Sequence, residues 1–189
     1  MIEFLINIDH NLFLWLNGFH NGYFDQIMLW VSHSRTWLPL YVFLIFLLFK
    51  KFGIKQGIIY ILIIIVAVGC SDFITSGLMK PFFGRLRPCH NPEIMSQMHL
   101  VGNCGGQYGF VSSHASNSFA LFFIISQIGI YKKYLKPAML LWAIIVSYSR
   151  IYLGVHFPID VFVGASIGIC ISFLIFEFYK KILSTIINS

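Results

Sequence analysis

Three short stretches of this chain carry the side chains best suited to chemistry: residues 80–88, 111–114 and 149–160. Together they supply lysine and arginine side chains, two histidines, an aspartate and neighbouring serines. Converging cations bind phosphate oxygens, and a histidine beside them can attack phosphorus or move a proton. The pattern therefore indicates chemistry on a phosphate group.

The cations and two expected helix starts predict an anion site. Lys80, Arg87 and Arg150 can surround a phosphate, and the planar guanidinium group suits paired phosphate oxygens. Helices are expected to begin near Ser112 and Pro158, where free N–H groups and the positive end of the helix dipole also attract anions.

The histidines provide a nucleophile and a proton donor. Asp160, in the first turn of a helix, can reach back to a ring nitrogen of His156 and select its tautomer. A neutral, oriented imidazole beside a phosphate can attack phosphorus, and His114 can protonate the departing oxygen. No ligand set in the chain argues for a metal, and we expect no cofactor.

Composition decides where this site must lie. Of 189 residues, 58% are hydrophobic and 11% are charged, whereas soluble domains carry about 25% charged residues. A soluble globular enzyme, a nucleic-acid-binding module and a disordered tail are thereby excluded. The formal net charge of +6 does not indicate nucleic acid, because the lysines form small clusters between apolar stretches.

The apolar segments predict an all-α integral membrane protein forming one domain over residues 1–189. Residues 1–22 are expected to form an amphipathic helix in the membrane interface. Five membrane spans are expected, or six if the residues before 35 also cross. They cover residues 37–49, 57–78, 111–130, 135–152 and 159–179.

The lysine clusters predict the topology. Residues 50–55, 132–136 and 180–181 hold these clusters, and alternating spans place all three on one side, which the positive-inside rule makes cytoplasmic. The polar loop 80–110 and the turn around His156 then face the other side. No removable signal peptide is expected, and a bacterial inner membrane, with the site facing the periplasm or exterior, suits the chain.

The three stretches resemble the type 2 phosphatidic acid phosphatase family, whose superfamily includes the vanadium haloperoxidases. The family pattern is Lys-x6-Arg-Pro, Pro-Ser-Gly-His and Ser-Arg-x5-His-x3-Asp. The chain has Lys80-x6-Arg87-Pro88, Val111-Ser112-Ser113-His114 and Ser149-Arg150-x5-His156-x3-Asp160. The first and third stretches match at every defining position, whereas the second has Val for Pro and Ser for Gly.

This resemblance implies a residue-by-residue mechanism. His156 would form a phosphohistidine, Asp160 would orient it, and His114 would protonate the leaving group and then activate water. The phosphoryl oxygens would be held by Lys80, Arg87, Arg150, Ser112 and the backbone N–H of Ser113. The family needs no metal. Because Ser113 replaces a glycine, we expect an altered leaving-group preference.

Four residues outside the motifs also draw attention. Arg85 is as consistent with a lipid-headgroup contact as with a site residue. Asp72, inside a span, is expected to pair with Lys80, because an ionisable group there is costly alone. Cys89 and Cys104 both lie in the polar loop, where we expect a disulfide.

The expected activity is hydrolysis of a lipid phosphate monoester or pyrophosphate. Phosphatidic acid, phosphatidylglycerol phosphate, undecaprenyl pyrophosphate and lipid A phosphate all fit, because the motifs bind phosphate and not its carrier. Three alternatives stay open: an anionic-lipid transporter or flippase, a lipid-to-lipid phosphotransferase and, with less support, a haloperoxidase. The oligomeric state does not follow from the sequence.

Overall fold

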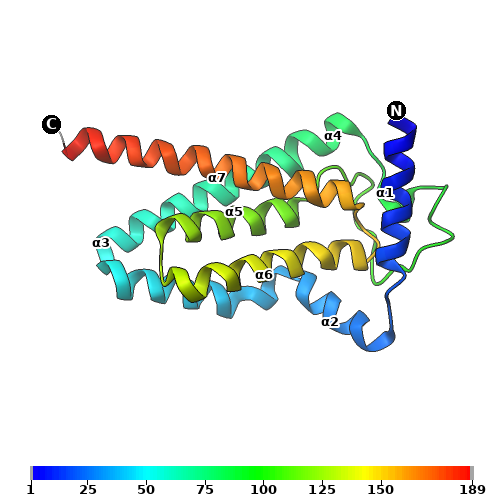
Figure 1. The fold of residues 1–189 in the computed structure, drawn as a ribbon, viewed down its shortest axis with the longest axis horizontal. Coiled ribbons are helices and arrows are strands. Elements are labelled where there is room, and N and C mark those ends of the chain that lie inside the picture. Colours follow the sequence, from blue (N-terminus) through cyan, green and yellow to red (C-terminus); the bar gives the residue numbers. More distant parts are fainter. Residues whose placement is uncertain (1, 188–189) are drawn as a thin grey trace.

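A computed structural model describes residues 2–187 of the chain (Figure 1). Within these residues the regular structure is helical, and the only sheet-like pairing is a bridge between Leu86 and Tyr108. The elements are α1 (Ile2–Asn17), α2 (Gly22–Ser32), η1 (Ser34–Trp37), α3 (Leu38–Asp72), η2 (Phe73–Met79), α4 (Lys80–Phe83), η3 (Pro88–His90), α5 (Ser113–Ile128), α6 (Lys132–Tyr152) and α7 (Pro158–Ile187).

Helix α3 consists of two arms that fold back on each other at Gly53 (Figure 1). Gly53 has φ 74°, a left-handed conformation that glycine adopts without steric cost. The arms pack closely, since a Cβ atom at Gly57 would come within 2.5 Å of the Phe49 ring. These arms correspond to the first two predicted spans, and the second continues through the π-helix η2 into α4.

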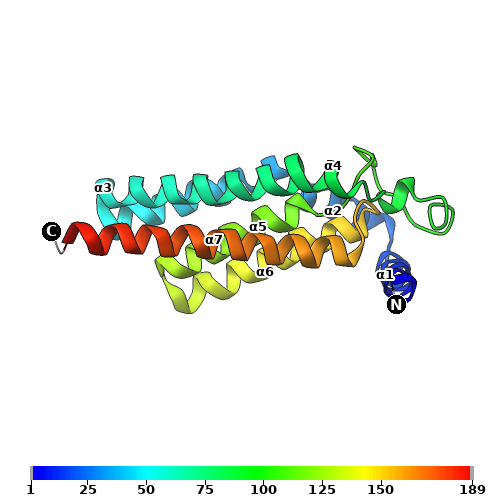
Figure 2. The ribbon, with the colours of Figure 1, turned by 90° about the horizontal axis from the view of Figure 1, so that it is seen from above.

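Helix α5 lies inside the bundle, between α6 and α7 (Figures 1 and 2). Small residues bring it against α7: a Cβ atom at Gly164 would lie 2.4 Å from the Ser112 carbonyl oxygen, and one at Gly168 would lie 2.1 Å from that of Ser116. A helix held this tightly gives its first turn, which carries His114, a well-defined position.

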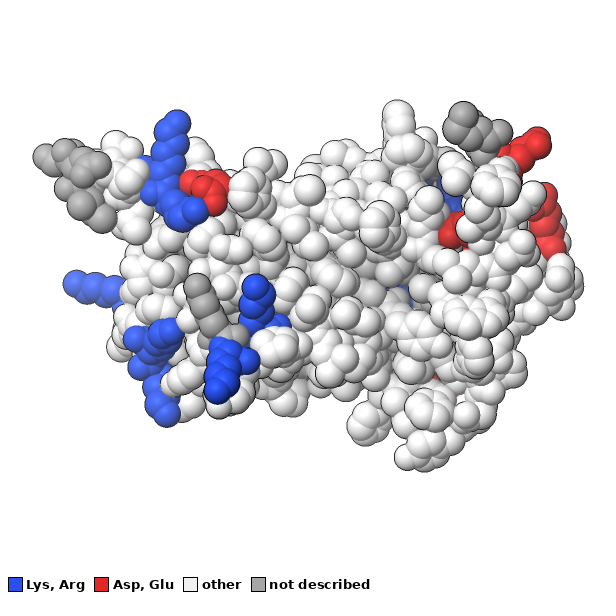
Figure 3. Space-filling model, viewed as in Figure 1, with Lys and Arg blue, Asp and Glu red and all other residues white. Residues whose placement is uncertain are grey.

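The outer surface of the bundle is apolar. Leu62, Leu174 and Phe178 are more than half exposed. Two helical stretches, residues 34–83 and 158–185, are long and apolar enough to cross a membrane. Figure 3 shows Lys and Arg gathered at the end that holds the α3 turn, the α5–α6 connection and the end of α7, as the predicted topology requires.

Helix α1 lies crosswise at the opposite end of the bundle (Figures 1 and 2). Its exposed face is largely apolar, as expected for an interfacial helix, and its other face contacts the bundle. Asn17, at its last residue, is 1% exposed and donates hydrogen bonds to the carbonyl oxygens of His99 and Tyr152. The exposed apolar residues are Phe4, Leu5, Ile8, Leu12 and Trp15.

Candidate active site

The motif residues meet at the end of the bundle that α1 crosses. Lys80 begins α4, Arg87 lies in the loop before η3, and Arg150 lies in the last turn of α6. His114 is in the first turn of α5, and His156 lies just before α7. Helices α5 and α7 begin at Ser113 and Pro158, which confirms the predicted helix starts.

Three cations of the site form no ion pair within the described part of the chain. Lys80 Nζ lies 3.4 Å from Ser113 Oγ. Arg87 is held by the carbonyl oxygens of Cys104 at 2.8 Å and Tyr108 at 3.2 Å. Arg150 donates to the Ser32 hydroxyl, while its Nε is buried without a hydrogen-bond partner. Cations without counter-charges can hold an anion such as a phosphoryl group.

The backbone at the start of α5 adds to this cationic cluster. Ser112 is the N-cap of α5, and its hydroxyl accepts from the Ala115 N–H at 3.5 Å. The Ser112 N–H donates to the Asp160 carbonyl oxygen at 2.9 Å, which ties the starts of α5 and α7 together. The positive ends of two helix dipoles therefore lie side by side at the site.

His156 and Asp160 are fully enclosed, with 1% and 0% exposure. His156 Nδ1 lies 3.5 Å from Asp160 Oδ2 and forms no hydrogen bond, so the carboxylate is beside the ring but not tightly bonded to it. Such contacts are often long in the absence of substrate. Asp160 Oδ2 also accepts the Phe157 N–H at 2.9 Å.

Burial lowers the pKa of His156 well below its ordinary value, and the charges of Arg150, Arg87 and Lys80 lower it further. The imidazole is therefore neutral in the folded protein at neutral pH. A neutral ring has a free lone pair on one nitrogen, which a nucleophile requires.

This lowered pKa predicts a pH-dependent stability. Below about pH 6.5 His156 is protonated in the unfolded chain but not in the folded protein. The free energy of unfolding therefore decreases as the pH is lowered, by up to about 1.4 kcal/mol per pH unit. The midpoint of thermal unfolding in detergent, measured from pH 7 to pH 5, should fall less steeply in His156→Asn. The same change at the exposed His33 should leave the slope as in the original protein, and equal slopes for all three would refute the buried neutral ring.

His114 lines a cavity of about 730 Å³ that His156 does not line. The cavity lies between both arms of α3, α5 and α6, and its walls are largely apolar, including Leu44, Leu48 and Ile61. Asp72 and Asn117 are among its polar residues. The two histidines thus differ in surroundings: one is enclosed and the other borders an apolar space.

Asp72 does not form the expected pair with Lys80. Its Oδ1 accepts from Asn117 Nδ2 at 2.9 Å and from the Ser76 hydroxyl at 3.4 Å. The intervening segment, η2, is a π-helix, whose wider turn changes the angular relation between positions 72 and 80. The α-helical spacing behind that prediction therefore does not apply.

Arg85 and Asp9 lie at the site although neither belongs to the three motifs. Arg85 lies between two carboxylates, with Nη1 2.6 Å from Asp160 Oδ1 and Nη2 2.6 Å from Asp9 Oδ2. These ion pairs favour the site-residue alternative for Arg85 over a lipid-headgroup contact. The only available signal was an arginine two positions before the motif arginine, and nothing marked Asp9 as its partner.

Gly109 is a second residue without a sequence signal. A Cβ atom there would lie 3.1 Å from Asp160 Oδ2 and 3.2 Å from Arg87 Cγ. The backbone of the polar loop thus lies against both the Asp160 carboxylate and the aliphatic stem of Arg87, at a distance that glycine permits.

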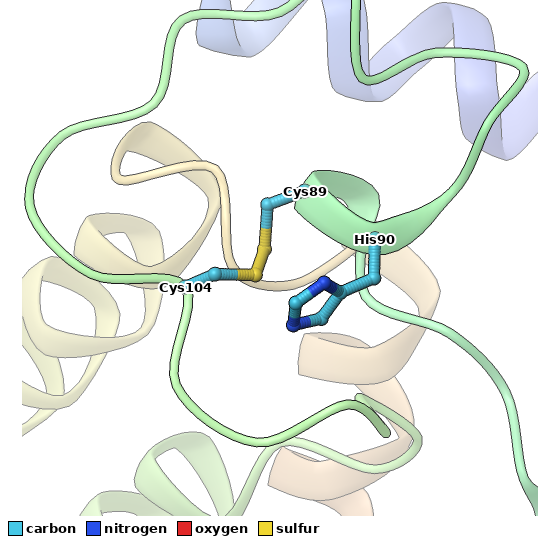
Figure 4. A group of neighbouring side chains, drawn as sticks. All are labelled: Cys89, His90 and Cys104. Atoms are coloured by element: carbon cyan, nitrogen blue, oxygen red, sulfur yellow. A yellow bond between two sulfur atoms is a disulfide. The ribbon is translucent and has the colours of Figure 1, made fainter.

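The polar loop is closed by a disulfide between Cys89 and Cys104, whose Cα atoms are 6.0 Å apart (Figure 4). It links the segment after Arg87 to the residue whose carbonyl oxygen accepts from Arg87. His90 lies beside the sulfur atoms, within 4.8 Å. Both sulfurs are bonded to each other, so they cannot ligate a metal while the disulfide is intact.

Known proteins are similar to this chain in sequence and in fold. The model of the PAP2 superfamily matches residues 56–184. A lipid A 4'-phosphatase of Bacteroides thetaiotaomicron is 39% identical over 172 residues, which cover 89% of this chain and 75% of that protein. A lipid A 4'-phosphatase of Porphyromonas gingivalis is 33% identical over 181 residues, with 94% and 75% covered.

A solved structure has the same architecture. The crystal structure of Aquifex aeolicus LpxE aligns with a TM-score of 0.70 at 25% identity, covering 88% of this chain and 93% of that one. The family model spans most of the helical bundle and all three motif stretches from residue 80 to residue 160. This chain therefore belongs to the PAP2 superfamily.

Proposed function

We propose that this protein is a metal-independent lipid phosphatase that cleaves a phosphate monoester through a phosphohistidine on His156. The observation that carries the proposal is a cluster of unpaired cations around a buried, neutral imidazole with a carboxylate beside Nδ1. Because the chain is similar to lipid A 4'-phosphatases, lipid A phosphate is the first substrate to test.

In the first step, His156 Nε2 attacks phosphorus while the bond from phosphorus to the lipid oxygen breaks. Asp160, beside Nδ1, stabilises the positive charge that develops on the ring. His114 gives a proton to the lipid oxygen, which leaves as an alcohol. The phosphoryl oxygens are held by Lys80, Arg87, Arg150, the Ser112 hydroxyl and the Ser113 N–H.

In the second step, water attacks the phosphohistidine. His114, now without its proton, takes one from the attacking water, the phosphorus–nitrogen bond breaks and inorganic phosphate leaves. His156 returns to its neutral form. The oxygen atom gained by the phosphate comes from water, which distinguishes this route from transfer to a second lipid.

The apolar cavity supports a lipid as leaving group. Attacking and leaving groups lie on opposite sides of phosphorus in an in-line displacement. Because His114 lines the cavity and His156 does not, the cavity lies on the leaving-group side. Its apolar walls and its volume of about 730 Å³ fit hydrocarbon chains carried by the lipid leaving group.

Asp72 favours a monoester over a diphosphate. It is an exposed carboxylate on the same cavity as His114, where a second phosphate on the leaving group would meet its negative charge. A neutral alcohol can instead donate a hydrogen bond to it. We therefore place lipid monoesters, such as lipid A phosphate, ahead of undecaprenyl pyrophosphate.

Replacing Asp72 with asparagine should raise kcat/KM for a lipid diphosphate about fivefold relative to that for a lipid monoester, because one repulsive charge is removed. Phosphate release from the two substrates gives the ratio directly. Glu177→Gln, on the exposed surface of α7, is the matched control and should not change it. An unchanged ratio in Asp72→Asn would remove this argument for a monoester.

We also propose five membrane spans, formed by the two arms of α3 and by α5, α6 and α7, with α1 in the interface. The lysine clusters lie at the end opposite the site, so the positive-inside rule places the site on the extracytoplasmic face. A bacterial inner membrane provides both this orientation and phosphorylated lipids at that face.

The test is phosphate release by detergent-purified protein in excess EDTA, against phosphatidic acid, phosphatidylglycerol phosphate, undecaprenyl pyrophosphate and lipid A. We expect release that survives EDTA, is inhibited by vanadate and favours a monoester. Loss of activity in EDTA that added metal restores would refute metal independence. A folded protein that binds these lipids without releasing phosphate would support the transporter or flippase, and phosphate passed to another lipid would support the phosphotransferase.

A further inference from the structure

We infer that Arg85 is a positioning residue for the nucleophile and that α1, through Asp9, is a structural part of the active site. The inference rests on the proposed function, because it assigns Arg85 and Asp9 to the support of His156. It gives a role in the active site to an arginine outside the motifs and to a helix that the sequence predicts only as an interfacial helix.

The ion pairs of Arg85 connect α1 to the start of α7. Its two terminal nitrogens each lie 2.6 Å from a carboxylate oxygen, one on Asp160 and one on Asp9. Asp160 is 0% exposed and Asp9 is 6% exposed, so each of these buried carboxylates gains a direct ion pair from the same guanidinium group. Both terminal nitrogens of Arg85 are thus engaged by carboxylates of the protein itself.

A second contact from α1 fixes the backbone beside the nucleophile. Asp9 Oδ1 accepts the Ile159 N–H at 2.9 Å, while Asp9 Oδ2 contacts Arg85. Asp9 thus holds residue 159 directly and residue 160 through Arg85. Burial raises the pKa of the Asp9 carboxyl, and the contacts with Arg85 and the Ile159 N–H oppose that rise.

The aromatic ring next to the nucleophile is enclosed by the same elements. The Arg85 guanidinium carbon lies 4.2 Å from the centroid of the Phe157 ring. His10 stacks on this ring at 4.9 Å, and Phe13 meets its edge at 5.4 Å. Phe157 is 0% exposed and directly follows His156 in the chain. Side chains of α1 and Arg85 therefore hold the residues on which the direction of the imidazole depends.

This arrangement explains why an interfacial helix lies at the site. The outward face of α1 is largely apolar and suited to the headgroup region, while its inward face supplies Asp9, His10 and Phe13. Through these contacts, the position of α1 in the membrane surface affects the position of the segment from His156 to Asp160. The nucleophile is expected to be best oriented when α1 is bound to the membrane.

The experiment compares Arg85→Met, Arg85→Lys, Asp9→Asn and the double variant Asp9→Asn/Arg85→Met, with Arg35→Met as the matched arginine control. We expect Arg85→Met to lower kcat roughly 10- to 100-fold, as loss of an orienting group does, with KM changed less than about threefold. Lysine should restore part of kcat, since one ammonium group can pair with one carboxylate. Binding of inorganic phosphate, measured calorimetrically, should be unchanged, because the three cations of the site remain.

The double variant tests whether Asp9 and Arg85 act as one unit. If they do, kcat of the double variant equals that of Arg85→Met, whereas independent effects multiply. Multiplying effects, an unchanged kcat in Arg85→Met, or a joint loss of kcat and phosphate binding would each overturn the positioning role.

Hydrogen–deuterium exchange separates this inference from the proposed function. Amide protection of residues 157–161 should fall in Arg85→Met and Asp9→Asn but not in Arg35→Met, whether or not the protein releases phosphate. Unchanged protection in both variants would overturn the inference even for an active enzyme. A wild-type protein without phosphatase activity would refute the proposed function, while the exchange pattern would still decide whether Asp9 and Arg85 hold the segment.

Discussion

Replacing His156 with alanine is expected to reduce phosphate release by about 10⁴- to 10⁶-fold, the loss seen when a covalent nucleophile is removed. The effect should be this large because the ring is enclosed among Lys80, Arg87 and Arg150, and alanine leaves nothing that can attack a phosphate held there. The measurement is phosphate release from the preferred lipid, with thermal unfolding to verify that the variant is folded.

His90→Ala provides the matched control, because His90 is an exposed histidine of the polar loop. It should retain the original rate. If the folded His156→Ala protein kept more than about one hundredth of the activity, another group would have to be the nucleophile.

Replacing His114 with alanine is expected to lower the rate on a lipid monoester about 10²- to 10⁴-fold, the usual contribution of a general acid. An alkoxide leaves slowly unless it is protonated, and His114 borders the cavity proposed for the leaving group. A p-nitrophenyl ester has a leaving group that departs without a proton, so its phosphorylation step should be much less affected. Single-turnover rates on the two substrates measure the difference.

His33→Ala serves as the control for this comparison, since His33 is exposed and lies outside the cavity lining. Equal losses on both substrates would contradict the role of His114 as proton donor to the leaving group. Such a result would indicate that His114 holds the phosphoryl group instead.

Much of the fold could be predicted because its signals are local. Apolar runs located the helices, and Ser112 and Pro158 marked two helix starts that the structure confirms. The lysine clusters predicted which connections between helices lie at the same end of the bundle, and Figure 3 shows Lys and Arg gathered at one end. Motif spacing likewise indicated which residues would meet, because the family pattern already encodes their tertiary proximity.

The remaining features depend on contacts between distant elements. The Asp9–Arg85–Asp160 ion pairs join residues 75 and 76 positions apart in sequence, and no periodicity links them. The π-helix η2 invalidated the expected pairing of Asp72 with Lys80. The close approach of Gly109 to Asp160 and the cavity beside His114 arise only when the helices pack.

The most direct test of the central claim is to trap the intermediate. Purified protein would be mixed with a lipid monoester carrying labelled phosphate, quenched in alkali within the first turnover, and digested for mass spectrometry. We expect one labelled site, His156, with the acid lability and alkali stability of a phosphohistidine, and no label in His156→Ala. Label on Ser112 or Ser113, or full turnover with no labelled protein at any quench time, would contradict it.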